Sequence, residues 1–232
     1  MIQGIVFDKD GTLFDFAATW ESWAKAFLLR ASNGDTGQAR RLGQAIGFDL
    51  DQARFDPDSI VIAGTPGQIA DALLPHLPGQ GRADLIAMLN QEAETAPQAE
   101  AVPLRPLLGA LRARGLALGV ATNDAEGPAR AHLDKAGVTG LFDFIAGFDS
   151  GFGGKPGPGQ LLAFAAQMGV PPHQVVMVGD STHDLRAGRA AGMQVLGVLT
   201  GLADAQDLAP LADQVLPDIG ALPGWLDAQD NA

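Results

Sequence analysis

The sequence contains no cysteine, which excludes disulfide bonds and thiolate chemistry. It has no excess of basic residues, and its formal net charge of −12 at pH 7 argues against nucleic acid as a partner. No apolar stretch is long enough to span a membrane, because Arg112, Arg114 or a glycine interrupts the longest ones. A cluster of His and Cys residues, which would suggest zinc, is also missing.

The N-terminal end carries neither a basic segment nor a cleavage site, and residues 2–7 already form an apolar run typical of a strand. We therefore expect no secretion and a cytoplasmic location. Hydrophobic residues make up 47% of the sequence and charged residues 18%, a balance typical of folded globular proteins. A chain of 232 residues can bury one large core or two smaller ones.

Strand and helix patterns alternate in the part of the chain that follows Pro103. The strands predicted there are 116–121, 144–146, 175–178, 194–198 and 214–216. The helices predicted there are 104–114, 127–136, 158–168 and 185–191. Together with the first strand, this alternation predicts an α/β fold, a Rossmann-like, doubly wound parallel sheet with helices on both faces.

Residues 16–99 have a different character, with helical segments separated by turns and no confident strand. Only residues 59–62 are ambiguous. The helix predicted over 15–29 carries aromatic residues at spacings of 4, 3 and 4, which favour the core of a helical unit. These aromatic residues are Phe16, Trp20, Trp23 and Phe27. We therefore expect one α/β domain, 1–15 with 100–232, interrupted by a helical insertion at 16–99.

Polar side chains follow the predicted strands or precede the helix at residue 158. They are Asp8, Asp10, Thr122, Asn123, Lys155, Asp180 and Asp184. Because ligands bind at the carboxyl ends of the strands in open α/β sheets, we expect these side chains to share one site. Aspartates as close as Asp8 and Asp10 repel each other unless a cation or a shared proton relieves the repulsion.

The carboxylates favour a divalent cation at this site. Asp8, Asp10 and Asp180 are the predicted metal ligands, with Asp10 binding through its backbone carbonyl. Oxygen ligands of this kind suit Mg²⁺, which binds through a few carboxylates and keeps several waters. Asp184 lies one helical turn after Asp180 and is expected to orient Lys155 or a metal-bound water.

The same residues suggest separate catalytic roles. Asp8 is the predicted nucleophile, because carboxylates form aspartyl-phosphate intermediates. Asp10 can protonate a leaving oxygen and later activate water. Lys155, the Thr122 hydroxyl and the backbone N–H of Asn123 are the predicted phosphate-binding groups.

Four segments resemble the motifs of the haloacid dehalogenase (HAD) superfamily, in the order of that family. They are Asp8–Leu13, Ala121–Asn123, Lys155–Pro158 and Val178–Asp184. The resemblance covers residues 1–15 and about 103–200, and the insertion between the first two motifs is similar to the family's C1 helical cap. The overall pattern most resembles phosphoglycolate phosphatase-like members.

This resemblance implies a Mg²⁺-dependent phosphatase that hydrolyses a small phosphorylated metabolite, phosphoglycolate-like or a sugar phosphate, through an aspartyl phosphate on Asp8. A phosphomutase of the same superfamily is the alternative, followed by a dehalogenase or a non-catalytic binding protein. The protein is expected to be a monomer or a homodimer. Lys9 departs from the family pattern, in which a bulky apolar residue is frequent, and it either changes the local charge balance or points away.

Each of these residues also has a simpler interpretation. Asp8 and Asp10 can belong to an exposed turn, and Lys155 can be a solvated lysine of a loop. Thr122 or Asp180 can cap the helix that follows it. The order of all four motifs favours the functional interpretation. His183 is expected to be a surface residue or to bond a neighbour, and one aromatic residue at the start of the insertion can face the substrate.

Overall fold

The computed structural model describes residues 1–230. The strands are β1 (Gly4–Phe7), β2 (Phe48–Asp49), β3 (Arg54–Phe55), β4 (Ala117–Ala121), β5 (Phe144–Ala146), β6 (Val175–Gly179), β7 (Gln194–Val198) and β8 (Gln214–Leu216). The α-helices are α1 (Phe16–Ala31), α2 (Thr36–Ala45), α3 (Pro66–Leu73), α4 (Arg82–Thr95), α5 (Leu104–Ala113), α6 (Glu126–Lys135), α7 (Gly159–Met168), α8 (Thr182–Ala190), α9 (Ala205–Leu208) and α10 (Leu222–Asp230). None of the helices described is long and apolar enough to cross a membrane.

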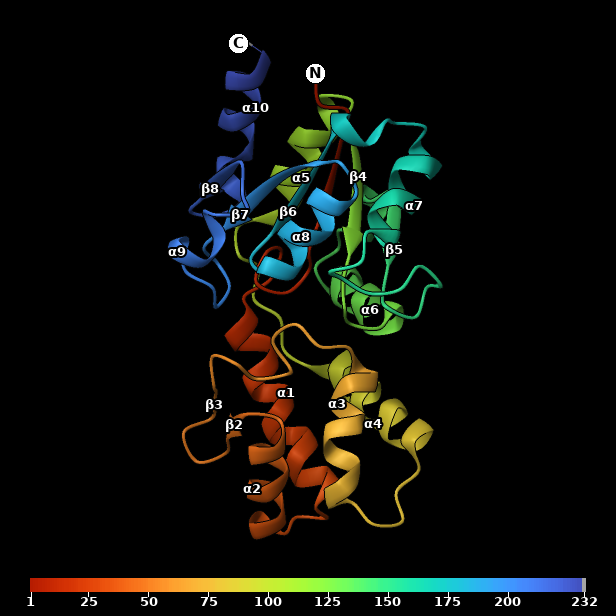
Figure 1. The fold of residues 1–232 in the computed structure, drawn as a ribbon, viewed down its shortest axis with the longest axis vertical. Coiled ribbons are helices and arrows are strands. Elements are labelled where there is room, and N and C mark those ends of the chain that lie inside the picture. Colours follow the sequence, from red (N-terminus) through yellow and green to blue (C-terminus); the bar gives the residue numbers. More distant parts are fainter. Residues whose placement is uncertain (231–232) are drawn as a thin grey trace.

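Six strands form one parallel sheet in the order β5-β4-β1-β6-β7-β8 (Figure 1). Alternate side chains of each strand point to opposite faces, and both faces are covered. On β1, Ile5 and Phe7 join a cluster with α5 and α10, whereas Val6 joins a cluster with α7 and α8. The prediction of a doubly wound α/β sheet is confirmed.

The strand order places a topological switch at β1. From β1 the chain continues to β4 and β5 on one side, and it later returns to β6 on the other. The register pairs Phe7 with Val120 and with Val178, so β1, β4 and β6 end at the same edge of the sheet. A crevice beyond such a switch is the usual ligand site of open α/β sheets.

Residues 16–96 contribute a separate hydrophobic cluster that includes the aromatic residues of α1. Helices α1 to α4 lie beyond the carboxyl edge of the sheet, in the red-to-yellow part of Figure 1. Trp23 and Phe27 stack there at 5.5 Å between ring centroids, as expected for a core stripe. We refer to residues 16–99 as the cap segment.

The cap segment also contains a hairpin of β2 and β3, where no confident strand was expected. Each strand has only two residues, too few to show an alternating pattern in the sequence, and the ring pair Phe48–Phe55 at 4.7 Å closes it. The ambiguous residues 59–62 form turns. The insertion is otherwise helical, and this short hairpin is an addition that the sequence pattern does not indicate.

The chain enters and leaves the cap segment side by side. The backbone N–H of Asp15 donates to Ala99 at 2.8 Å, and that of Ala101 donates to Leu13 at 2.9 Å. Asp15 also caps α1 by accepting from the backbone of Ala18. Two hydrogen-bonded linkers therefore join the cap segment to the sheet domain.

Helix α8 begins at Thr182, three residues before its expected start. The side chain of Ser181 accepts from the backbone of Asp184, and the Asp184 carboxylate accepts from the Ser181 backbone. This capping box extends the helix to the end of β6. It therefore fixes Asp184 beside the strand ends.

Candidate active site

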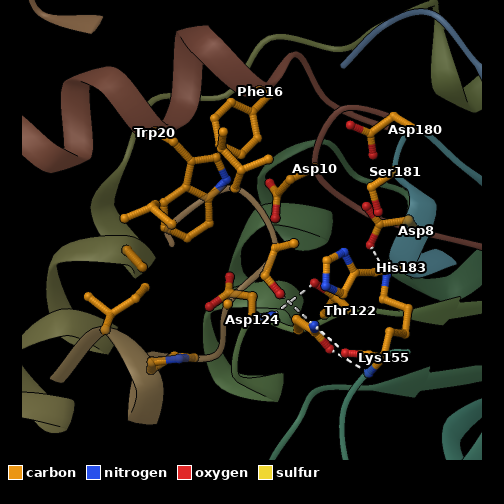
Figure 2. Close-up of a pocket in the computed structure, with 18 of the residues that line it drawn as sticks. Asp8, Asp10, Phe16, Trp20, Thr122, Asp124, Lys155, Asp180, Ser181 and His183 are labelled. Atoms are coloured by element: carbon orange, nitrogen blue, oxygen red, sulfur yellow. Dashed lines mark hydrogen bonds and ion pairs between the residues drawn. The ribbon is translucent and has the colours of Figure 1, made fainter. Parts of the chain in front are cut away.

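Asp8 stands directly after β1, and its backbone N–H continues the sheet by donating to Val178 at 2.8 Å. The carboxylate is largely buried and forms an ion pair with Lys155. Lys155 reaches it from the loop ahead of α7, and its Nζ also lies 2.6 Å from Oδ1 of Asp184. One ammonium group therefore contacts two of the predicted site carboxylates, and its contact with Asp8 is drawn in Figure 2.

Three buried carboxylates gather at this point. Oxygens of Asp8, Asp180 and Asp184 all lie within 4.8 Å of one another. Burial raises the pKa of Asp8 to about 7, with the neighbouring aspartates adding to the shift and Lys155 opposing it. Burial, together with the charges of Asp8 and Asp184, also raises the pKa of Asp180 against the effect of Lys155. The negative charge exceeds what Lys155 neutralises, so this oxygen-rich cluster fits a divalent cation.

Two glycines make room for the Asp180 carboxylate. A Cβ on Gly11 would lie 2.3 Å from Oδ2 of Asp180, and a Cβ on Gly201 would lie 1.7 Å from it. Gly11 also has a φ of +77°, which L-residues with side chains rarely adopt. The carboxylate therefore sits in a cradle of backbone that larger residues would fill.

Thr122 and Asn123 follow β4. The Asn123 side chain accepts from the Lys155 backbone N–H at 2.8 Å and donates to the Lys155 carbonyl at 2.9 Å. Its amide also donates to the carbonyl of Ala63, in the cap segment. The Thr122 hydroxyl accepts from the backbone of Asp124 at 3.1 Å, and α6 begins later, after Ala125 without a side-chain cap. Thr122 is therefore not the N-cap of that helix.

Lys9 points into the protein and has no exposed surface. Its Nζ lies 2.7 Å from the Asp10 carboxylate, 3.4 Å from Asp124 and 2.9 Å from Nδ1 of His132. It also lies 5.5 Å from the centroid of the Trp20 ring. The pKa of Lys9 is raised, because the two carboxylates outweigh the effect of burial. The alternative in which Lys9 points away is therefore excluded.

Sequence reasoning missed Asp124 and His132. Burial, with the nearby Asp10 charge, raises the pKa of Asp124 to about 6 against the opposing effect of Lys9. His132, on α6, is fully buried, and its Nε2 lies 2.7 Å from the carbonyl of Ala93 on α4. That carbonyl only accepts, so Nε2 carries the proton and Nδ1 accepts from Lys9. No short motif marks these residues.

A pocket joins the sheet domain to the cap segment. Its sheet-domain wall contains every residue predicted for the site, together with Asp124, Ser181 and His183. Phe16 and Trp20 of α1 cover the pocket from the cap side, beside Asp10 (Figure 2). His183 therefore faces the pocket, and burial lowers its pKa. One aromatic residue was expected here, but Phe16, Trp20 and Trp23 all line the pocket.

Comparisons with known proteins agree with this geometry. A family model described as haloacid dehalogenase-like hydrolase matches residues 2–192. A phosphoglycolate phosphatase of Escherichia coli O157:H7 is 38% identical over 209 residues, covering 86% of this chain and 82% of that protein. A phosphoglycolate phosphatase of Rhodospirillum rubrum is 40% identical over 120 residues, but the match spans only 52% of this chain and 50% of that protein.

Solved structures show the same fold. A β-phosphoglucomutase from Clostridium difficile superposes with a TM-score of 0.67 at 19% identity, covering 96% of this chain and 93% of that one. At that identity the likeness concerns the fold alone. The chain therefore belongs to the haloacid dehalogenase-like hydrolases, and its relatives place it among the phosphatases of that family.

Proposed function

We propose that the protein hydrolyses small phosphomonoesters through an aspartyl phosphate formed on Asp8, with Mg²⁺ as cofactor. The observation that carries this proposal is the position of Asp8. It directly follows β1 at the topological switch, is paired with Lys155, and shares one pocket with Asp10. A nucleophile, a cation for the phosphoryl oxygens and an acid thus face the same space.

The phosphoryl group binds against Lys155, the Thr122 hydroxyl and the backbone N–H of Asn123. In the first step a carboxylate oxygen of Asp8 attacks phosphorus and the bond to the ester oxygen breaks. Asp10 gives its proton to that leaving oxygen, so a neutral alcohol departs. The product is an aspartyl phosphate on Asp8 with Asp10 ionised.

The second step restores the enzyme. Asp10 takes a proton from the attacking water, whose oxygen bonds to phosphorus while the bond to Asp8 breaks. Inorganic phosphate leaves, and Asp8 is again a carboxylate. Asp10 thus acts as acid in one step and as base in the next.

The metal would be held by the carboxylates of Asp8 and Asp180 and by the backbone carbonyl of Asp10. When bound, Mg²⁺ neutralises the charge that develops on the transferred phosphoryl group. Asp184 holds Lys155 at 2.6 Å and so keeps its ammonium beside Asp8. The cradle at Gly11 and Gly201 supports this assignment, because it leaves the Asp180 carboxylate space beside Asp8 and Asp184.

We further propose that residues 1–15 and 100–232 form the catalytic domain, and that the cap segment 16–99 covers the site. The separate hydrophobic cluster of the cap segment supports this division. Closure would exclude bulk water from the phosphoenzyme and add side chains that select the alcohol.

The test is release of phosphate from p-nitrophenyl phosphate and from simple alkyl phosphates, with Mg²⁺ and with EDTA. We expect Mg²⁺-dependent release that Asp8→Asn reduces by at least about 10³-fold. Asp58→Asn, an exposed carboxylate of the cap segment, serves as the matched control. Unchanged release by Asp8→Asn would overturn the mechanism. Conversion of a sugar phosphate to its isomer instead of phosphate release would assign a phosphomutase.

A further inference from the structure

The cap wall of the pocket is apolar. Its side chains include Phe16, Trp20, Trp23, Val61, Ile69 and Leu89. No Lys, Arg, Asp or Glu of the cap segment lines the pocket in the described part of the chain. The organic half of a substrate would therefore meet aromatic and aliphatic surface, which favours an uncharged group because a buried unpaired charge is costly.

The sheet-domain wall adds a second constraint. Five carboxylates line the pocket, and they are Asp8, Asp10, Asp124, Asp180 and Asp184. The lysine among the pocket residues, Lys155, is already paired with two of these carboxylates. Even with one divalent cation bound, an additional carboxylate on the substrate would be repelled.

A positively charged organic group would find no carboxylate to pair with among the described residues of the cap wall. Aromatic rings attract ammonium groups, and the ring of Trp20 faces the pocket. However, the Nζ of Lys9 already lies 5.5 Å from the centroid of that ring. A second cation at Trp20 would be repelled by the first.

Two polar atoms in the cap wall lack a partner. The indole Nε1 of Trp20 and the side-chain oxygen Oδ1 of Asn90 are buried without a hydrogen bond to any residue that the structure describes. Both residues line the pocket, and the Trp20 side chain is more than nine-tenths buried. By contrast, Nε1 of Trp23 donates to the carbonyl of Leu89 at 3.2 Å. The two free atoms offer one donor and one acceptor to a ligand.

Resting on the proposed phosphatase function, we propose that the alcohol half of the substrate is uncharged and largely apolar, with a hydroxyl or amide group for Trp20 and Asn90. Burial of such an alcohol against the aromatic wall contributes binding free energy, and its hydroxyl or amide group supplies hydrogen bonds to the two unpartnered atoms. Charged alcohols, including glycolate, fit this wall poorly.

The test compares three primary alkyl monoesters whose alcohols differ in charge. They are 2-phenylethyl phosphate, 2-phosphoglycolate and phosphoethanolamine. We expect kcat/KM for 2-phenylethyl phosphate to exceed that of both charged esters by at least about 30-fold, as burial of an aromatic ring implies. Equal or better turnover of either charged ester would overturn the inference.

A variant in the cap wall sharpens the comparison. Asn90→Lys places a cation in that wall, and we expect it to raise kcat/KM for 2-phosphoglycolate relative to 2-phenylethyl phosphate by about 10-fold or more. Trp20→Phe keeps an apolar ring but loses the N–H. It should lower turnover of a hydroxyl-bearing ester, 2-hydroxy-2-phenylethyl phosphate, more than that of 2-phenylethyl phosphate. An unchanged ratio in both variants would overturn the inference.

Failure of the inference and failure of the proposed function are distinguishable. Suppose that Mg²⁺-dependent hydrolysis of p-nitrophenyl phosphate is lost in Asp8→Asn. This result would support the proposed phosphatase function, whichever alkyl ester has the highest kcat/KM. Calorimetric titration of the Asp8→Asn protein with the same three esters gives their dissociation constants without turnover. Tightest binding of 2-phenylethyl phosphate is expected, and tightest binding of a charged ester would overturn the inference independently of catalysis.

Discussion

The ammonium group of Lys9 lies 2.7 Å from the carboxylate of Asp10, the proposed acid of the reaction. The Lys9 side chain is fully buried. The same ammonium contacts Asp124 and His132, and His132 continues to the Ala93 carbonyl in the cap segment. Lys9 is thus the centre of a buried polar network that spans the two parts of the molecule.

Replacement of Lys9 by Met should damage acid catalysis selectively. The Lys9→Met change keeps an unbranched side chain of similar length but removes the ammonium group that holds the Asp10 carboxylate at 2.7 Å, so Asp10 is no longer positioned toward the leaving oxygen. We expect kcat/KM to fall about 100-fold on an alkyl phosphate and less than about 10-fold on p-nitrophenyl phosphate, whose leaving group needs little protonation.

The ratio of the two kcat/KM values is the measurement. Lys135→Met is the control, because Lys135 donates to a carbonyl of the cap segment, at Glu94, and makes no ion pair with Asp10. Equal losses on both esters would show that Lys9 only maintains the fold.

His132 should make the folded protein sensitive to mild acid. Burial, with the charge of Lys9 adding to it, lowers the pKa of His132 to about 4, below the ordinary value of 6.5. The unfolded chain therefore takes up this proton first as the pH falls, so stability is lost between about pH 6.5 and pH 4. The full loss is about 3 kcal/mol, reached below pH 4.

Urea unfolding of the wild type and of His132→Gln, from pH 7.5 to pH 4, isolates this contribution. The wild-type free energy of unfolding should fall relative to that of the variant as the pH decreases. Other buried groups titrate in both proteins and cancel in the difference. Parallel curves would contradict the assignment of His132 as a buried neutral side chain.

Asp180→Asn should stabilise the metal-free protein but weaken its binding of Mg²⁺. Without metal the clustered carboxylates repel, so removal of one charge should raise the melting temperature in EDTA by a few degrees. The wild type should gain about 3 kcal/mol from Mg²⁺ at 100 times its dissociation constant, whereas the variant should gain little. Thermal unfolding with EDTA and with Mg²⁺ measures both effects, and an equal Mg²⁺ response in the two proteins would contradict the proposed ligand.

Gly201→Ala should act through Asp180. The added methyl would meet the Asp180 carboxylate at 1.7 Å, so the carboxylate must leave its present position in the cluster with Asp8 and Asp184. We expect at least a tenfold loss of Mg²⁺ affinity, measured from the Mg²⁺ dependence of phosphate release. Gly224→Ala is the control, because a Cβ there meets no atom within 4 Å. Equal affinities in the two variants would argue against Asp180 as a ligand.

The sequence predicts those features that are decided by residues close together along the chain. The bounds of β5, β7 and β8 match the predicted strands, because turns flank each apolar run. Asp8 and Asp180 could be placed at one edge because parallel strands end together. Their roles as nucleophile and metal ligand stay predictions.

Contacts between distant residues could not be predicted in this way. Lys9 and His132 are 123 positions apart, and nothing in either local pattern indicates their 2.9 Å contact. Asp124 follows Asn123 and has the pattern of an ordinary loop residue. The β2–β3 hairpin is likewise decided by packing within the cap segment rather than by the propensity of four residues.

The paired linkers have a consequence for how such an enzyme changes its specificity. Asp15 and Ala99 are neighbours in space, so the whole cap segment is attached at one place. The proposed chemical groups come from the sheet domain, whereas the apolar wall belongs to the inserted segment. A different insertion with ends equally close could be grafted between these two residues, and it would bring a new substrate preference to an unaltered reaction centre.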